Sequence, residues 1–89
     1  MITTNIRERT RAYITENFLY MRNGADALLD DDQSLLESGV VDSMGIMELV
    51  QFIENEFGLV VDDVDITEQN LGTISGITRY VASKRAAAA

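Results

Sequence analysis

Residues 37–58 have the sequence ESGVVDSMGIMELVQFIENEFG. Within this stretch, residues 43–57 predict an amphipathic helix, because the apolar side chains fall within roughly a 100° arc when successive residues are placed 100° apart. These side chains are Ile46, Leu49, Val50, Ile53 and Phe57. Gly58 is typical of the position just past a helix end. The stretch therefore predicts a helix with one buried face that begins at a serine preceded by an aspartate.

A first helix is predicted before this stretch, over residues 5–21. Its apolar residues recur at helical spacing, and Asn5 followed by Glu8 has the spacing of a capping box. Residues 22–42 show no long periodic pattern, so we expect a long crossover loop there. The paired apolar residues of this loop predict that it is held against the core. They are Leu28, Leu29, Leu35, Leu36, Val40 and Val41.

Two more helices are predicted after the central stretch. Asp65 followed by Glu68 has capping spacing and predicts a short helical turn that ends near Leu71. Thr73 is expected to cap a last helix. The apolar face of that helix would comprise Ile74, Ile77 and Val81. The chain is therefore predicted to be all-α, with four helices.

Length and composition limit the classes of function. The chain has 89 residues, no Cys and no His. This length fits one small domain, so we expect a single domain over 1–89 with a frayed tail over 86–89. Because the commonest general base and the thiolate nucleophile are missing, we expect no catalytic residues, no metal site and no enzyme activity of its own.

The charge balance limits the partners. The formal net charge is −8, which repels nucleic acid and anionic membranes and favours basic protein surfaces. No apolar run approaches the roughly 20 residues of a spanning helix, and the N-terminus lacks the layout of a signal peptide. We therefore expect a cytoplasmic monomer that binds proteins and neither nucleic acid nor membranes. The acidic clusters at 30–32 and 62–65 lack the glycine and distal glutamate of a calcium loop, so solvated loop charge is favoured over a cation site and over a calcium-responsive protein.

The triplet Asp42-Ser43-Met44 follows a glycine turn and precedes an aliphatic and acidic helix, and this context resembles the attachment signature of the acyl carrier protein family. Taken alone, the triplet would favour a plain helix cap. The resemblance covers nearly the whole chain and includes Glu56-Phe57-Gly58 at the helix end. It implies a four-helix bundle of the acyl-carrier type, with a long loop between helices 1 and 2 and a short third helix.

The resemblance also implies a cofactor and partners. A phosphopantetheinyl transferase, with Mg²⁺ and coenzyme A, would join 4'-phosphopantetheine to Ser43, since nothing in the chain could activate that hydroxyl. The arm's thiol would hold acyl or aminoacyl intermediates as thioesters and present them to loading and downstream biosynthetic enzymes with basic docking surfaces. Asp42 would serve the transferase or cap the helix. The Ser-Met-Gly run at 43–45 resembles carriers of aminoacyl groups, including D-alanyl carriers, and carriers of peptide and polyketide assembly lines.

Five residues border Ser43 on the helix wheel outside the core arc, and we expect them to contact partners. They are Met44, Met47, Glu48, Gln51 and Asn55. The alternative for the two methionines is that they cover neighbouring helices. Gly45 costs about 0.8–1.0 kcal/mol relative to alanine in a helix, and we expect it to allow close approach of a partner's backbone.

Two further alternatives stay open at this point. Several apolar side chains behind the helix could part to admit an acyl chain, although core packing is favoured. They are Ile46, Val50, Val61 and Ile66. The alternative function is an unmodified acidic helical adaptor, in which Ser43 only caps the helix and the acidic face binds one basic protein.

Overall fold

The computed structural model describes residues 2–19 and 30–88. Its four α-helices are α1 (Ile2–Ile14), α2 (Ser43–Phe57), α3 (Glu68–Leu71) and α4 (Ile74–Ala88). A π-helical turn, η1 (Thr15–Leu19), continues α1, and a 3₁₀ turn, η2 (Asp63–Asp65), precedes α3. The described residues contain no strand, which confirms the all-α prediction. None of the described helices is long and apolar enough to cross a membrane.

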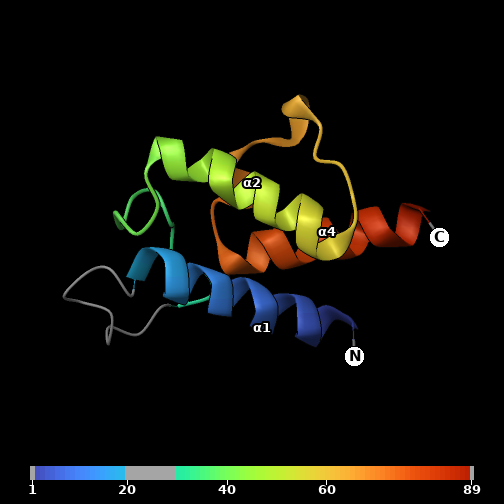
Figure 1. Ribbon diagram of the computed structural model, residues 1–89, viewed down its shortest axis with the longest axis horizontal. Helices are drawn as coiled ribbons and strands as arrows, with labels where there is room; N and C mark the ends of the chain where they lie inside the picture. The colour runs from blue at the N-terminus through green and yellow to red at the C-terminus, as the bar shows by residue number, and fades with distance from the viewer. Residues whose placement is uncertain (1, 20–29, 89) are drawn as a thin grey trace.

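The helices pack around one apolar core. In Figure 1, α1 and α4 lie side by side and α2 crosses on one side of them, and close backbone contacts join α1 to α4. The predicted faces of α2 and α4 are buried, except that Ile46 is only half-buried. The fully buried side chains of the core include Ile6, Ile14, Leu49, Ile53, Leu71, Ile74, Ile77 and Val81. Burial of each such side chain stabilises the fold by about 1.5–3 kcal/mol.

The predicted start of the first helix is wrong. The helix begins at Ile2, three residues before the expected cap, so Asn5 lies inside it. An asparagine in a helix costs only a few tenths of a kcal/mol relative to most residues, so it does not stop the helix. The helical path continues through η1 to Leu19, and residues 20 and 21 lie outside the described residues.

The two C-terminal helices differ in how well their caps were predicted. Thr73 caps α4 as expected, because its Oγ1 accepts the N–H of Gly76 at 2.9 Å. The cap of α3 is Thr67 and not Asp65, since Thr67 Oγ1 accepts the N–H of Asn70 at 3.2 Å. Asp65 instead ends η2, where its carboxylate accepts the hydroxyl of Tyr80 at 2.9 Å. The helix α4 continues to Ala88, into the segment 86–89 for which we expected a frayed tail.

The described part of the crossover, residues 30–42, is held to the core as predicted, with one exception. Leu35, Val40 and Val41 are buried, whereas Leu36 is 41% exposed. The N–H of Leu35 donates to the carbonyl of Gly72 at 2.8 Å. The predicted contacts of Leu28 and Leu29 lie outside the described residues.

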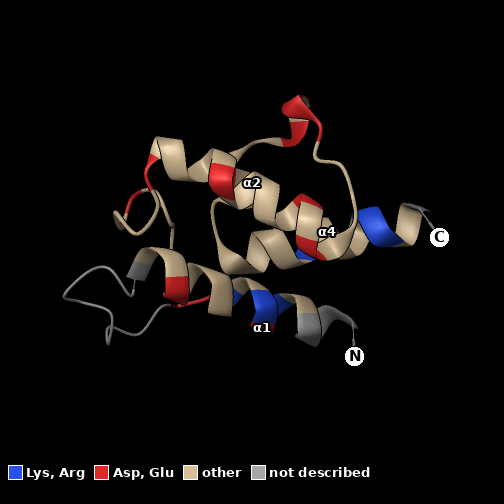
Figure 2. Ribbon diagram, viewed as in Figure 1, with Lys and Arg blue, Asp and Glu red and all other residues tan. Residues whose placement is uncertain are grey.

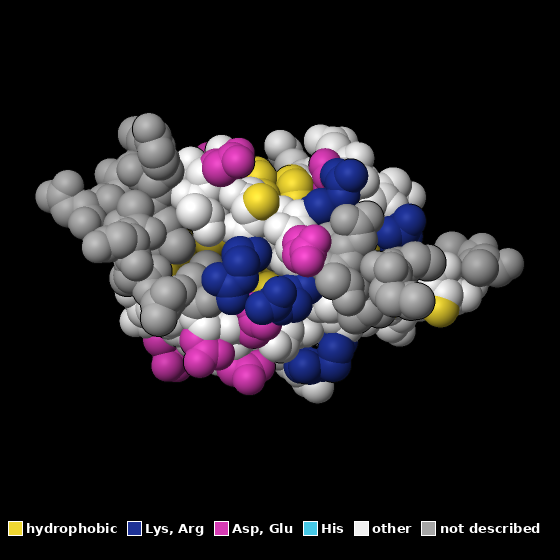
Figure 3. Space-filling view, turned by 90° about the horizontal axis from the view of Figure 1, so that it is seen from below, with side chains coloured by type: hydrophobic (Ala, Val, Ile, Leu, Met, Phe, Trp, Pro, Cys, Tyr) yellow, Lys and Arg dark blue, Asp and Glu magenta, His cyan; other side chains and the backbone are white. Residues whose placement is uncertain are grey.

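We expected the first acidic cluster, residues 30–32, to carry only solvated charge. This is wrong for Asp31. Its carboxylate accepts hydrogen bonds from Arg7 and Arg11 of α1, and its carbonyl accepts the N–H of Ser75 at 2.9 Å. Figure 3 shows the result on the face seen from below, where basic and acidic side chains lie next to each other. Asp31 therefore fastens the crossover to both α1 and α4.

Candidate functional site

Ser43 is the first residue of α2 and its side chain is exposed. The preceding residue, Asp42, is the N-cap, with an extended backbone at φ −94° and ψ 179°. Its Oδ1 accepts the N–H of Gly45 at 2.7 Å, and its carbonyl accepts the N–H of Ile46 at 3.1 Å. Of the two roles expected for Asp42, the structure shows the cap.

The turn before α2 sets the position of Ser43. Gly39 has a φ of +80°, in the left-handed region that favours glycine, and its N–H donates to the carbonyl of Leu36 at 3.1 Å. The next two residues, Val40 and Val41, are buried. Because these valines hold the chain against the core just before the cap, Ser43 emerges at the surface on the first turn of a rigid helix.

A contact inside the chain explains Gly45. It is buried, and a Cβ at this position would lie 2.8 Å from Phe18 Cε1, 3.1 Å from Val41 Cγ1 and 3.2 Å from Asp42 Oδ1. Cβ atoms do not approach other atoms as closely as 2.8 Å, so any larger residue would displace the Phe18 ring. We expected Gly45 to allow close approach of a partner protein's backbone. Such a partner is not needed to explain this glycine, because Phe18 of η1 packs against Gly45.

The five predicted partner-contacting residues all have exposed side chains on α2. Met44 is 80% exposed and Met47 is 52% exposed, so neither methionine serves mainly to cover a neighbouring helix. The other three are Glu48, Gln51 and Asn55. The structure therefore brings the predicted residues together on one accessible helix face beside Ser43.

The same face continues onto α1 through aromatic side chains that sequence reasoning did not select. Tyr13 stacks on Phe52 with 4.0 Å between ring centroids, and its hydroxyl donates to the carbonyl of Glu48 at 3.3 Å. Burial, and to a lesser extent the charge of Glu48, raises the pKa of Tyr13 above its ordinary value. Because Tyr13 and Phe52 lie on different helices, the helical spacing within either one does not reveal this contact.

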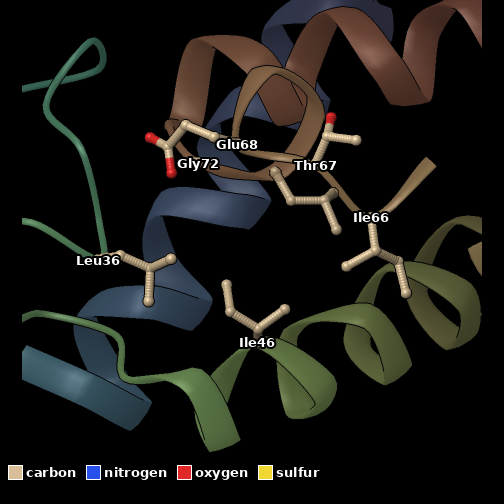
Figure 4. Close-up of a pocket in the computed structure, with 7 residues that line it drawn as sticks. Leu36, Ile46, Ile66, Thr67, Glu68 and Gly72 are labelled. Carbon is tan, nitrogen blue, oxygen red and sulfur yellow. The ribbon is translucent and has the colours of Figure 1, made fainter. Parts of the chain in front are cut away.

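A cavity of about 140 Å³ lies between α2 and α3 (Figure 4). Its apolar walls are Leu36, Ile46, Ile66 and Leu71. Ile46 and Ile66, expected to be core residues, are only half-buried and point toward this space in Figure 4. Val50 and Val61 are buried and do not line it. Two of the four residues considered for an acyl chain therefore do border this small cavity, which Thr67, Glu68 and Gly72 also line.

Charge is distributed unevenly along the chain. Between Asp30 and Thr78 the sequence contains no Lys or Arg, and α2 contains three glutamates. Figure 2 shows acidic residues on α2 and on the η2 loop, and basic residues on α1 and near the end of α4. Within residues 2–19 and 30–88, no three Asp or Glu side chains are grouped closely enough to hold a metal ion.

The comparisons with known proteins show the family of this chain. A family model described as the phosphopantetheine attachment site matches residues 21–81, which include Ser43 and all of α2 and α3. This chain belongs to that family. It is also similar to an acyl carrier protein from Thermotoga maritima, with 29% identity over 59 residues that cover 66% of this chain and 70% of the relative. The chain is therefore a member of the acyl carrier protein family, its cofactor is covalently attached 4'-phosphopantetheine, and it works with partner biosynthetic enzymes.

The first turn of α2 fits the phosphate of this cofactor. Among the described residues, no hydrogen bond uses the N–H groups of Ser43 and Met44, which open the helix. Unpaired N–H groups and the positive end of the helix dipole favour an anion at this position. The carboxylate of Asp42 is already engaged by the N–H of Gly45. The residues present can therefore hold a phosphodiester on the Ser43 hydroxyl.

Proposed function

We propose that Ser43 is the residue of this carrier to which 4'-phosphopantetheine is attached. The observation that supports this assignment best is the exposed position of Ser43 at the first residue of α2, inside the matched range 21–81. Three other serines lie in that range. Ser34 donates to Glu68 Oε2 at 3.1 Å and Ser38 donates to the carbonyl of Leu35 at 3.3 Å, so both hydroxyls are engaged. Ser75 lies in α4 and is half-buried. Ser43 is the serine placed to react.

The chemistry of attachment is divided between this chain and a transferase. Ser43 Oγ bonds to the phosphorus that bears the pantetheine of coenzyme A, the phosphoanhydride bond of coenzyme A breaks, and adenosine 3',5'-bisphosphate leaves. No His or Cys is present in the chain, so the transferase supplies the base that takes the serine proton. The cofactor then supplies a thiol, on which acyl or aminoacyl intermediates are held as thioesters.

The exposed face of α2 is proposed to dock the transferase and the loading and downstream enzymes. Its residues are Met44, Met47, Glu48, Gln51 and Asn55. Flexible methionine side chains adapt to several partners, and a glutamate favours basic surfaces. The Ser-Met-Gly run at 43–45 favours a specialised carrier, of aminoacyl groups or of a peptide or polyketide assembly line, over a housekeeping fatty-acid carrier. A single domain over 1–89, a monomeric state and a cytoplasmic location stay predictions.

The decisive experiment is intact mass spectrometry before and after incubation with coenzyme A, Mg²⁺ and a broad-specificity phosphopantetheinyl transferase. We expect the wild type and Ser38→Ala to gain one phosphopantetheinyl group and Ser43→Ala to gain none. Ser43→Ala should keep the helical content of the wild type, because the side chain is exposed and the cap belongs to Asp42.

Two outcomes would count against this proposal. Loading of Ser43→Ala would move the attachment to another residue. Failure to load the folded wild type, with a transferase shown to be active on another carrier, would favour the adaptor function, in which Ser43 only opens the helix. In that case, binding to a basic partner protein should survive Ser43→Ala.

A further inference from the structure

An open depression of about 350 Å³ lies where the end of α1 and η1 meets the start of α2. In Figure 1 these two helix ends lie at the same end of the molecule. Asp42 and Met44, the two neighbours of Ser43, both line this α1–α2 depression. Its wall on the other side comes from Asn17 and Phe18 of η1. The depression therefore begins beside the serine proposed to bear the cofactor.

We propose that the α1–α2 depression is the resting site of the pantetheine part of the arm when no partner enzyme is bound. This inference rests on the proposed attachment at Ser43. It concerns the part of the arm beyond the phosphate, which contains a geminal dimethyl group, a hydroxyl, two amides and the thiol. A site for this part must offer both apolar contact and hydrogen-bond acceptors.

The apolar contact comes from three side chains that line the depression. Met44 is 80% exposed, Phe18 is half-buried, and Val40 adds an aliphatic wall. The Phe18 ring is fixed by its contact with the backbone at Gly45 and by an edge-to-face contact with Tyr13, with ring centroids 5.9 Å apart. A fixed aromatic ring beside an adaptable methionine suits the dimethyl group.

The acceptors come from Asn17 and Glu48. Asn17 Nδ2 donates to the carbonyl of Tyr13 at 2.9 Å, which fixes the amide and leaves its Oδ1 as an acceptor. The Glu48 carboxylate is exposed, and none of the hydrogen bonds or ion pairs found among the described residues uses it. The N–H groups of the two pantetheine amides are matching donors. Because this part of the arm is uncharged, acidic lining residues do not repel it.

The cavity between α2 and α3 is a poorer site for the same group. Its volume of about 140 Å³ is less than half that of the α1–α2 depression, and its walls are mainly Leu36, Ile46, Ile66 and Leu71. An engineered apolar cavity of about 150 Å³ stays dry and accepts benzene. Thr67, Glu68 and Gly72 also line this cavity, but their oxygens already accept hydrogen bonds from Asn70, Ser34 and Leu35 respectively. Amides of the arm would therefore find fewer unused acceptors there to replace their hydrogen bonds to water. The arm is therefore expected on the α1 side of α2.

The test is nuclear magnetic resonance on the carrier labelled with ¹³C and ¹⁵N and loaded from unlabelled coenzyme A. We expect isotope-filtered nuclear Overhauser effects from the dimethyl protons of the arm to the Phe18 ring and the Met44 methyl group. The amide signals of Asn17 and Gly45 should shift between the unloaded and loaded forms. The inference would be overturned if the nuclear Overhauser effects from the dimethyl protons reached Ile46 and Ile66 instead. It would also be overturned if these effects reached no residue other than 42–44.

A pair of matched variants separates specific contact from proximity. Asn17→Ala removes one of the two acceptors of the depression, and we expect it to lose most of the intensity of the arm-to-Phe18 effects. Gln69→Ala removes an exposed side-chain amide on α3, outside the depression and outside the proposed docking face, and should keep them. Intact mass reports loading in every sample, so a loaded wild type without these effects contradicts only the resting site, whereas an unloaded wild type contradicts the proposed attachment.

Discussion

Two buried threonines differ in whether their hydroxyls have a partner. Thr10 of α1 is 0% exposed, and its Oγ1 has no hydrogen-bond partner among the described residues. Thr78 of α4 is 7% exposed, and its Oγ1 donates to the carbonyl of Ile74 at 2.8 Å. A buried hydroxyl without a partner loses its hydrogen bonds to water on folding, so Thr10 lowers the stability of the fold and Thr78 does not.

Replacing each threonine by valine tests this difference. We expect Thr10→Val to raise the free energy of unfolding by about 1 kcal/mol, because valine has the same shape and no polar atom to desolvate. Thr78→Val should lower it by about 0.5–1 kcal/mol, because a made hydrogen bond is lost. Urea unfolding followed by circular dichroism measures both. A Thr10→Val variant that is less stable than Thr78→Val would show that the Thr10 hydroxyl has a partner.

At the scale of elements, the crossover is fastened to the helices through Asp31. Burial alone would raise the pKa of this carboxyl, but the hydrogen bonds and positive charges of Arg7 and Arg11 hold the pKa below its ordinary value. A carboxyl with a lowered pKa in the folded state stabilises the fold above its unfolded pKa of about 3.9. That stabilisation is lost as the pH falls through the folded pKa.

Asp31→Asn should therefore destabilise the chain in a pH-dependent way. At pH 7 we expect the free energy of unfolding to fall by about 0.5–1 kcal/mol, a range that allows for screening of these partly exposed charges. The difference from the wild type should stay constant above about pH 5 and shrink toward zero as the pH falls from about 4 to 2. Urea unfolding at a series of pH values measures it. Asp32→Asn is the matched control, because Asp32 is exposed and forms no ion pair among the described residues.

At the scale of the whole molecule, we expect the separation of charge to orient the carrier toward its partners. The segment from Asp30 to Thr78 has no basic residue, and it contains Ser43 and the proposed docking face. A basic enzyme approaching this side is attracted, whereas the α1 side carries mixed charge. Long-range attraction of this kind changes the rate of association and weakens as salt screens it.

Charge reversals on the two sides test this orientation. We expect Glu48→Lys on α2 to lower kcat/KM of the transferase for this carrier by about fivefold at low salt, and the loss to diminish at about 1 M salt. Glu8→Lys on α1 changes the net charge equally at another exposed glutamate and should have a smaller effect. Equal effects of the two variants would mean that net charge alone, and not its position, controls association.

Local rules in the sequence determined the all-α fold, the bounds of α2, the Thr73 cap and the position of Ser43 at the start of a helix. Periodicity and caps involve residues three or four apart, so a single stretch such as 43–57 contains the whole signal. The same rules gave two wrong helix starts. Asn5 and Asp65 had the right spacing for a cap, but the helix containing Asn5 begins earlier and Thr67 caps the other.

Only the tertiary structure decided which residues distant in the sequence meet, including those beside Ser43. The contact of Phe18 with Gly45, the ion pairs of Asp31 and the stacking of Tyr13 on Phe52 join residues more than 15 positions apart in the sequence. Such contacts depend on how helices pack, and side chains with the same spacing can meet different partners in different packings. The sequence therefore determines which serine opens α2, whereas helix packing determines which side of α2 offers the arm a place to rest.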